Sequence, residues 1–303
     1  MDPDILLVSV ASSFPGVPQS KVQVRLHEDY NRKSLPSNEL NMSRVWDLRR
    51  KQNPKLYNGS KFRLHAIDVD EGSGWGGVTF CVGLTGYRDF ITTNWADNAP
   101  ELLESGWVDF GNSQAYMSDA IGVSALVQTV DGWAVFMRRS LSVGEAQGLW
   151  DVPGGHPEPG EVKGGSATVE DITLSDISEL DVSKELFESI IREVRDDINI
   201  PVLELKEAYL MGLSKNQTCA GRPSLQFFVE CKLQASQVRD LYRAGGPEAE
   251  ESMGLKLVPL SDLFTGKLEG SDMWKKMAPS GKGSVKLYTS MKNNPSISQD
   301  NVA

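Results

Sequence analysis

The stretch that decides the fold reads GGHPEPGE from Gly154 to Glu161 and continues, after an interruption, as REVRDDINI from Arg192 to Ile200. The first part is rich in glycine and proline and follows the strand-like run 149–152, which predicts a tight turn toward a helix. The second part ends a helix that we expect from Ser183, as its cap, to about residue 198, because apolar residues recur along one side. The two parts together predict a loop that faces the end of a helix.

Acidic residues crowd the end of this predicted helix. At 100° per residue, Glu193 and Asp197 lie within about 40° of each other and Asp196 about 60° from Glu193. Neighbouring like charges repel, and the C-terminal end of a helix favours cations. A divalent cation would remove both penalties, and oxygen ligands of this kind suit Mg²⁺. A solvated acidic helix face is the alternative interpretation.

The two parts resemble the Nudix box, G-x5-E-x7-R-E-U-x-E-E-x-G-U, in which U is aliphatic. Aspartates stand at 196 and 197 where the family has its glutamate pair, and Asn199 replaces the glycine. Six positions match outright: Gly155, Glu161, Arg192, Glu193, Val194 and Ile200. The chain is therefore identified as similar to the Nudix hydrolases.

The spacing departs from the family pattern. Thirty residues separate Glu161 from Arg192 where the family has seven, so 23 extra residues intervene. This leaves open whether Arg192 still pairs with Glu161, and whether residues 162–182 close over the site or extend into solvent. Asn199 is a mild change, because asparagine tolerates the left-handed conformation that ends many helices.

The resemblance implies an α/β fold, a Nudix α/β/α sandwich, preceded by a smaller α+β N-terminal domain. We expect the N-terminal domain at 1–115, where it contributes to substrate recognition, the Nudix domain at 116–292 and a flexible tail at 293–303. Alternating apolar residues and turn signals support this order, including an Asp-Gly hairpin at 131–132. The expected strands are 6–10, 22–26, 61–65, 78–82, 123–130, 133–137, 209–213, 225–231 and 255–258, with helices at 39–52 and 236–242 and in the last 30 residues.

Composition limits the functional classes. The 303 residues carry 31 Lys and Arg against 41 Asp and Glu, a net charge of −10 that argues against nucleic-acid binding. Three scattered cysteines are too few for a disulfide framework or zinc cage. The sequence contains no run of about 18 apolar residues, the length that a membrane-spanning helix needs. We expect a soluble protein of the cytoplasm, with the nucleus as a further location, and the oligomeric state stays open.

Four further segments narrow the resemblance: LWDVPGGHPEP (149–159), GLTGYRDF (83–90) followed by Thr93-Asn94-Trp95, KFRLH (61–65) and GGPEAEES (245–252). Together they look like the UDP-glucose/UDP-galactose pyrophosphatases of vertebrates, a branch of the Nudix superfamily. The resemblance implies Mg²⁺-dependent hydrolysis of a UDP-sugar to UMP and sugar 1-phosphate, with Mn²⁺ as an alternative metal. Two alternatives stay open: another nucleoside diphosphate substrate such as ADP-ribose, and a degenerate module that binds a nucleotide sugar without cleaving it.

The resemblance also implies roles for individual residues. It implies that Glu193 and Asp197 are metal ligands and catalytic groups, and that Asp196 either supports them or lies on the surface. Glu251, or its neighbour Glu250, helps to orient the attacking water. Seven residues are candidates for substrate binding: Tyr57 and Tyr87 at the uracil, Arg139 at the diphosphate, Asp151, His156 and Glu158 at phosphate or sugar, and Ser280 at phosphate or uridine. Ordinary core packing, surface ion pairs or loop stabilisation are the structural alternatives for these seven.

Overall fold

The larger sheet dominates the computed structural model, which describes residues 2–54, 56–70, 76–165 and 167–293. Within these residues nine strands form it, in the order β1-β10-β11-β6-β7-β12, with β2, β8 and β9 pairing at β10, β7 and β6. Strand β11 runs parallel to β6, and the other pairs are antiparallel. The strands are β1 (Ile5–Ser9), β2 (Val17–Pro18), β6 (Gly122–Gln128), β7 (Trp133–Arg139), β8 (Trp150–Asp151), β9 (Gly154–Gly155), β10 (Leu205–Asn216), β11 (Arg222–Cys231) and β12 (Ser252–Pro259).

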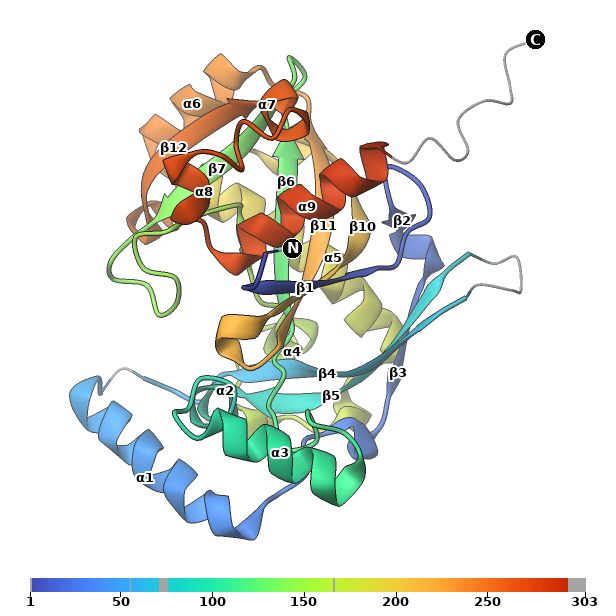
Figure 1. Cartoon of the computed structure of the whole chain (residues 1–303), viewed down its shortest axis with the longest axis vertical. Coiled ribbons are helices and arrows are strands. Elements are labelled where there is room, and N and C mark those ends of the chain that lie inside the picture. Colours follow the sequence, from blue (N-terminus) through green and yellow to red (C-terminus); the bar gives the residue numbers. More distant parts are fainter. Residues whose placement is uncertain (1, 55, 71–75, 166, 294–303) are drawn as a thin grey trace.

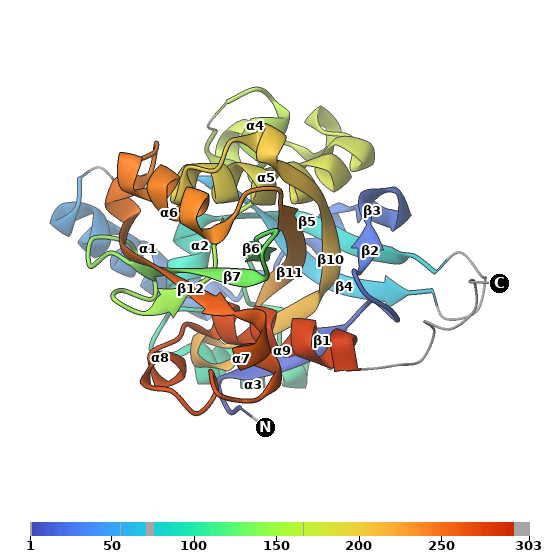
Figure 2. The same ribbon diagram turned by 90° about the horizontal axis from the view of Figure 1, so that it is seen from above.

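Helices cover both faces of this sheet, as Figure 2 shows. On one face lie α4 (Pro159–Val162), α5 (Glu179–Ile198) and α6 (Ala235–Ala244), and α5 buries Leu186, Ile190 and Val194. On the other face lie α7 (Leu260–Phe264), α8 (Asp272–Lys275) and α9 (Pro279–Asn293), with a separate apolar cluster beneath them. The predicted α/β/α sandwich is confirmed. Among the described helices, none has the length and apolar character that crossing a bilayer requires.

A smaller unit lies beside the sandwich, at the lower edge of Figure 1. Its sheet has the order β3-β5-β4, and helices α1, α2 and α3 lie below it in Figure 1. The elements are β3 (Val22–Leu26), α1 (Pro36–Gln52), β4 (Ser60–Val69), β5 (Val78–Gly86), α2 (Tyr87–Thr92) and α3 (Ala99–Phe110).

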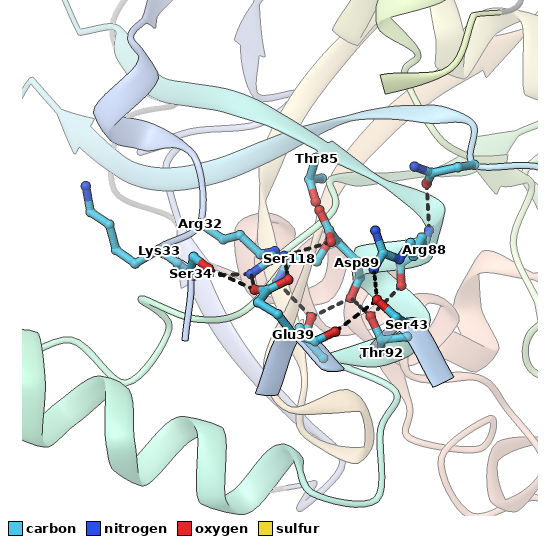
Figure 3. Close-up of polar contacts among 12 residues, drawn as sticks. Arg32, Lys33, Ser34, Glu39, Ser43, Thr85, Arg88, Asp89, Thr92 and Ser118 are labelled. Atoms are coloured by element: carbon cyan, nitrogen blue, oxygen red, sulfur yellow. Dashed lines mark hydrogen bonds and ion pairs between the residues drawn. The ribbon is translucent and has the colours of Figure 1, made fainter. Parts of the chain in front are cut away.

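A polar cluster fixes α2 to α1 (Figure 3). The half-buried guanidinium of Arg32 lies 3.0 Å from both Glu39 of α1 and Asp89 of α2. Arg88 of α2 donates to Ser43 of α1 at 2.9 Å. Ion pairs and hydrogen bonds of limited exposure hold geometry better than surface pairs. The segment that follows α2 therefore starts from a fixed point.

The first two strands belong to the larger sheet, although the prediction placed them in the smaller unit. Residues 5–9 of β1 pair with 212–216 of β10, and β2 pairs with the same strand. The chain therefore begins in the larger sheet and only then builds the smaller unit. Residues 294–303, most of the predicted tail, lie outside the described residues.

Helix α5 begins earlier than predicted. Its cap is Ser178, whose Oγ accepts the Asp181 N–H at 3.1 Å, and the expected cap Ser183 is buried inside the helix. The helix ends as expected at Asn199, which is left-handed with φ 64°. The end of the helix at Asn199 places the last turn of α5 under the loop that follows β9.

The extra residues between α4 and α5 pack on the smaller unit. The Ser60 N–H donates to the Ala167 carbonyl at 3.0 Å, and Gly59 forms a β-bridge with Thr168. The Asn58 amide donates to Glu170 at 3.0 Å. These contacts place the described part of the insertion along the start of β4, where it joins the two units.

Candidate active site

A cavity of about 430 Å³ opens where the two units meet around the loop after β8. Its lining comes from both units, from the end of α5, from the β10–β11 connection and from the start of α9. Seven of the predicted site residues line it: Arg139, Asp151, His156, Glu158, Glu193, Glu251 and Ser280. Segments far apart in the sequence thus meet in one polar cavity.

Glu193 brings the acidic end of α5 into this cavity. Burial raises the pKa of its carboxyl to about 7, and the nearby acids Glu248, Asp196 and Glu251 add to the rise. The carboxylate accepts the backbone N–H of His156. A cation beside Glu193 would offset both the burial and the repulsion.

Asp197 lies one turn further on and holds the loop. Its Oδ2 accepts the Gly154 N–H at 3.0 Å, and burial followed by Glu193 raises its pKa well above the ordinary value. Asp197 is not one of the described residues that line the cavity. Asp197 therefore contacts the backbone of the glycine loop, whereas Glu193 faces the cavity.

Gly155 allows this close approach. A Cβ atom built at this position would overlap the carboxylate of Glu193. Any side chain here would displace the Glu193 carboxylate, so the glycine of the box is explained by contact with the acid on α5.

The remaining acids divide into two groups. Asp196 forms an ion pair with its neighbour Arg195 at 2.6 Å and lies outside the lining. Glu248 precedes the short helical turn before β12, and Glu251 is its last residue. Both line the cavity. Glu248 is a site residue that the sequence did not single out.

Arg192 pairs with Glu185 rather than with Glu161. Its Nη2 lies 2.6 Å from Glu185 Oε1, which also accepts the Glu158 N–H at 3.1 Å. Glu161, on α4, is exposed. The arginine of the box therefore braces the glycine loop through a carboxylate of its own helix.

Two arginines supply positive charge. Arg139 Nε donates to the Glu145 carbonyl at 3.0 Å. Arg222, which sequence reasoning missed, is buried, forms an ion pair with Glu145 at 2.6 Å and donates to His156 Nε2. Burial, and then Arg222, lowers the pKa of His156 well below its ordinary value. The imidazole is neutral and serves as an acceptor for the arginine. The sequence signal for this role was weak, an arginine directly after the Ala220-Gly221 pair.

Asp151 and Ser280 hold each other. Ser280 Oγ donates to both carboxylate oxygens of Asp151, at 2.9 and 2.8 Å. Burial raises the pKa of Asp151, and Arg139 and Ser280 offset part of this rise. Glu158 forms an ion pair with Lys61 of β4. Both acids thus line the cavity while they tie its walls together.

The two tyrosines predicted at the uracil do not line the cavity, although both belong to described parts of the chain. Tyr57 is 54% exposed and packs beside Gly59. The ring of Tyr87 lies 6.2 Å from that of Phe90, and burial raises its pKa. Trp95, also of the smaller unit, is part of the lining.

The side chains of the site supply only some of the ligands that Mg²⁺ needs. In the described ranges, no group of three or more His, Cys, Asp or Glu is arranged to hold a metal ion. Mg²⁺, however, usually takes one or two carboxylates, keeps several waters and uses substrate phosphates as its other ligands. Half-buried Glu193, crowded by like charges beside Asp197, fits that mode of binding.

No protein-family model matches the chain. It is 40% identical over 297 residues to uridine diphosphate glucose pyrophosphatase NUDT22 of Homo sapiens, covering 97% of this chain and 95% of the human protein. It is 31% identical over 274 residues to Nudix hydrolase 9 of Arabidopsis thaliana, covering 88% and 86%. Among solved structures, a MutT protein from Methanosarcina mazei Go1 is 17% identical over 57% of this chain and 94% of its own, with a TM-score of 0.33. The chain belongs to the Nudix hydrolases.

Proposed function

We propose that this chain hydrolyses the diphosphate of UDP-glucose and UDP-galactose to UMP and sugar 1-phosphate with Mg²⁺. One observation carries the proposal: a single cavity holds the half-buried carboxylate of Glu193 together with the guanidinium groups of Arg139 and Arg222. Such a cavity offers an acidic place for a cation and basic groups for phosphate oxygens. The 40% identity to a uridine diphosphate glucose pyrophosphatase supports the choice of substrate.

Glu193 would hold the metal directly, and Asp197 would hold it from the adjacent turn or through water. When bound, Mg²⁺ neutralises charge on the diphosphate and lowers the pKa of a bound water. Asp197 also fixes the Gly154 backbone, so the loop and the cation site share one support. Asp196, paired with Arg195, would act on the site only by its charge.

Arg139 and Arg222 would bind the phosphate oxygens. The planar guanidinium group binds two oxygens at once, which fixes the orientation of a diphosphate. Arg222 is itself held by Glu145 and His156, so its direction is set before substrate arrives. Preorganised charge of this kind stabilises the transition state of phosphoryl transfer.

Glu251 and Glu248 would orient the attacking water and accept its proton. Both line the cavity that Glu193 faces, and their charge contributes to the raised pKa of Glu193. Asp151, Glu158 and Ser280 would contact the sugar or the phosphates, because their polar groups line the same cavity.

The test is a substrate panel compared by kcat/KM with Mg²⁺ present. UDP-glucose and UDP-galactose should exceed ADP-ribose by at least tenfold. A preference for ADP-ribose would assign another nucleoside diphosphate to the same chemistry. Binding of UDP-glucose without turnover of any diphosphate would contradict hydrolysis and favour a degenerate binding module.

A further inference from the structure

A buried ion pair lies where the smaller unit meets the segment that leads into β6. Arg63 of β4 is 1% exposed and Asp119 is 4% exposed, and Arg63 Nη2 lies 3.8 Å from Asp119 Oδ2. Replacing such a pair by apolar side chains is often neutral or stabilising, because the burial of two charges costs about as much as their attraction contributes. Stability alone therefore does not explain this pair.

Arg63 fixes the path of the segment between α3 and β6. Its Nε donates to the Met117 carbonyl at 3.0 Å, and its Nη2 donates to the Gln114 carbonyl at 2.8 Å. Arg63 and Ala120 also form an antiparallel β-bridge. Residues 117–121 are thus held against β4 of the smaller unit, directly before they continue into the larger sheet.

Asp119 has a left-handed backbone within this segment, with φ 44°. Residues other than glycine rarely adopt this conformation, and it persists only where the surroundings hold it. The Asn94 side chain does so, because its oxygen accepts the Asp119 N–H at 2.9 Å and its NH₂ group donates to Asp119 Oδ1 at 3.0 Å. Asn94 follows α2, so Asp119 joins the segment 117–121 to the end of α2.

Arg222 lies against both of these elements. Its Nε donates to the Ala120 carbonyl at 3.3 Å, and its guanidinium carbon lies 5.1 Å from the centroid of the Phe90 ring on α2. A Cβ built on Gly122 would lie 2.8 Å from Arg222 Nη2, so the guanidinium packs closely on this backbone. Asp119 therefore joins the two supports of Arg222, the backbone that follows Asp119 and the end of α2.

We propose that Arg63 and Asp119 are positioning residues that direct the guanidinium of Arg222 into the cavity. The inference rests on the proposed function, in which Arg222 binds phosphate oxygens, and it adds the residues that set the direction of Arg222. Residues 117–121 transmit the effect, because the Ala120 carbonyl is a direct partner of Arg222. Neither Arg63 nor Asp119 is among the described residues that line the cavity, so their effect on a ligand passes through Arg222.

The first experiment compares two ligands that differ in phosphate. One is uridine, and the other is the methylene analogue of UDP, in which a CH₂ group replaces the oxygen between the phosphates and prevents hydrolysis. NMR titration with Mg²⁺ present gives the Kd of each. Asp119→Asn keeps the size of the side chain and suits the left-handed backbone, but it removes the charge opposite Arg63.

Asp119→Asn should weaken the methylene analogue about tenfold or more, since a displaced arginine loses a charged hydrogen bond to phosphate. Uridine carries no phosphate and should bind as it does to the wild type. A general collapse of the cavity would weaken both ligands, so uridine separates positioning from a merely structural role.

Asp68→Asn is the matched control. Asp68 belongs to β4 and lies 3.9 Å from Arg25, a separation like that of Asp119 and Arg63, but these two side chains are 67% and 63% exposed. An exposed pair contributes little, so both ligands should bind Asp68→Asn as they bind the wild type.

Arg63→Lys is the second variant, and it gives the test if Asp119→Asn does not fold. It keeps a cation beside Asp119 but loses the forked bonds to two carbonyl groups. The methylene analogue should bind it more weakly than the wild type, with uridine unchanged. Wild-type affinity for the analogue in Arg63→Lys would overturn the positioning role of Arg63.

The second experiment is a double-mutant cycle between Asp119→Asn and Arg222→Lys, read as affinity for the methylene analogue. Arg222→Lys keeps the charge but removes the bond from Nε to the Ala120 carbonyl. If Asp119 acts through Arg222, the double variant should lose no more affinity than Arg222→Lys alone. Independent effects would multiply the two losses, and that result would overturn the proposal.

The outcomes separate this inference from the proposed function. If the wild type hydrolyses UDP-glucose but Asp119→Asn weakens uridine as much as the analogue, or weakens neither, the positioning role is wrong and hydrolysis stands. If the wild type cleaves no UDP-sugar yet the cycle couples Asp119 to Arg222, the positioning role stands and the proposed function fails. If the wild type does not bind the analogue, both fail.

Discussion

Arg192 Nη2 lies 2.6 Å from Oε1 of Glu185, seven residues earlier on α5. Seven residues are close to two helical turns, so both side chains project from the same side of the helix. In the box pattern, the carboxylate before the arginine stands eight residues away, and here the insertion has moved that glutamate to Glu161 on α4. Glu185 takes over the pairing and also accepts the Glu158 N–H. The insertion thus lengthens the chain without loosening the loop.

The pairing predicts that Glu185→Gln destabilises the fold. The change weakens a charge-assisted bond to Arg192 and one to the loop backbone, at a cost of about 1–3 kcal/mol. Urea unfolding measures the difference. Glu161→Gln, an exposed site, should stay within about 0.5 kcal/mol of wild type. Equal effects of the two substitutions would show that Glu185 does not brace the loop.

Glu193→Gln should lower turnover of UDP-glucose by about a hundredfold or more, as expected when one charged group of an active site is removed. The fold should survive, since burial already disfavours the Glu193 carboxylate. Steady-state kinetics and a thermal melt measure both. Glu188→Gln, exposed on the same helix, serves as control and should keep wild-type turnover. A folded Glu193→Gln variant with near-normal kcat would remove Glu193 from catalysis.

Gly155→Ala should impair activity more than stability. The added methyl group would overlap the Glu193 carboxylate, which is the mobile end of a side chain and can move away. The loop therefore keeps its fold while the acid leaves its place, and kcat should fall at least tenfold. At Gly165 no atom lies within 4 Å of a Cβ, so Gly165→Ala should have wild-type kinetics. Equal kcat for the two variants would contradict this contact.

Stability of the metal-free protein should fall as pH rises through about 4.5 to 7. Folded Glu193 has a pKa of about 7 against an ordinary 4.5, so in this window the native state binds the extra proton. The other acids whose pKa is raised act in the same direction. The contribution of Glu193 is therefore the difference between wild type and Glu193→Gln in how stability changes with pH. Thermal melts at pH 5 and pH 8 with EDTA measure it.

Added Mg²⁺ should raise the melting temperature more at pH 8 than at pH 5, because the cation binds the ionised carboxylates. Identical pH slopes for wild type and Glu193→Gln would contradict the raised pKa.

Local patterns predicted much of this molecule. The hairpin of β6 and β7, the apolar side of α5 and the left-handed end at Asn199 each follow from neighbouring residues, and all three are present. The N-terminal end of α5 was predicted wrongly. The prediction placed the cap at Ser183, but the helix is capped by Ser178, and Ser183 is buried within it.

Long-range contacts were not readable in the same way. Pairing of β1 with β10 joins residues more than 200 positions apart, so the sequence did not show that residues 5–9 belong to the larger sheet. Arg222, Glu145 and Trp95 lie far apart in the sequence, and tertiary contacts bring them to one cavity. Tyr57 and Tyr87 had the right chemistry for a uracil ring, but neither is part of the lining, whereas Trp95 of the same unit is.

The central claim is metal-dependent hydrolysis of the bond between the two phosphates of UDP-glucose. Purified protein incubated with UDP-glucose, with Mg²⁺ or with EDTA, and resolved by chromatography tests it directly. The account predicts UMP and glucose 1-phosphate in equal amounts, and only with Mg²⁺. UDP and free glucose, or intact UDP-glucose with every divalent metal tried, would contradict it.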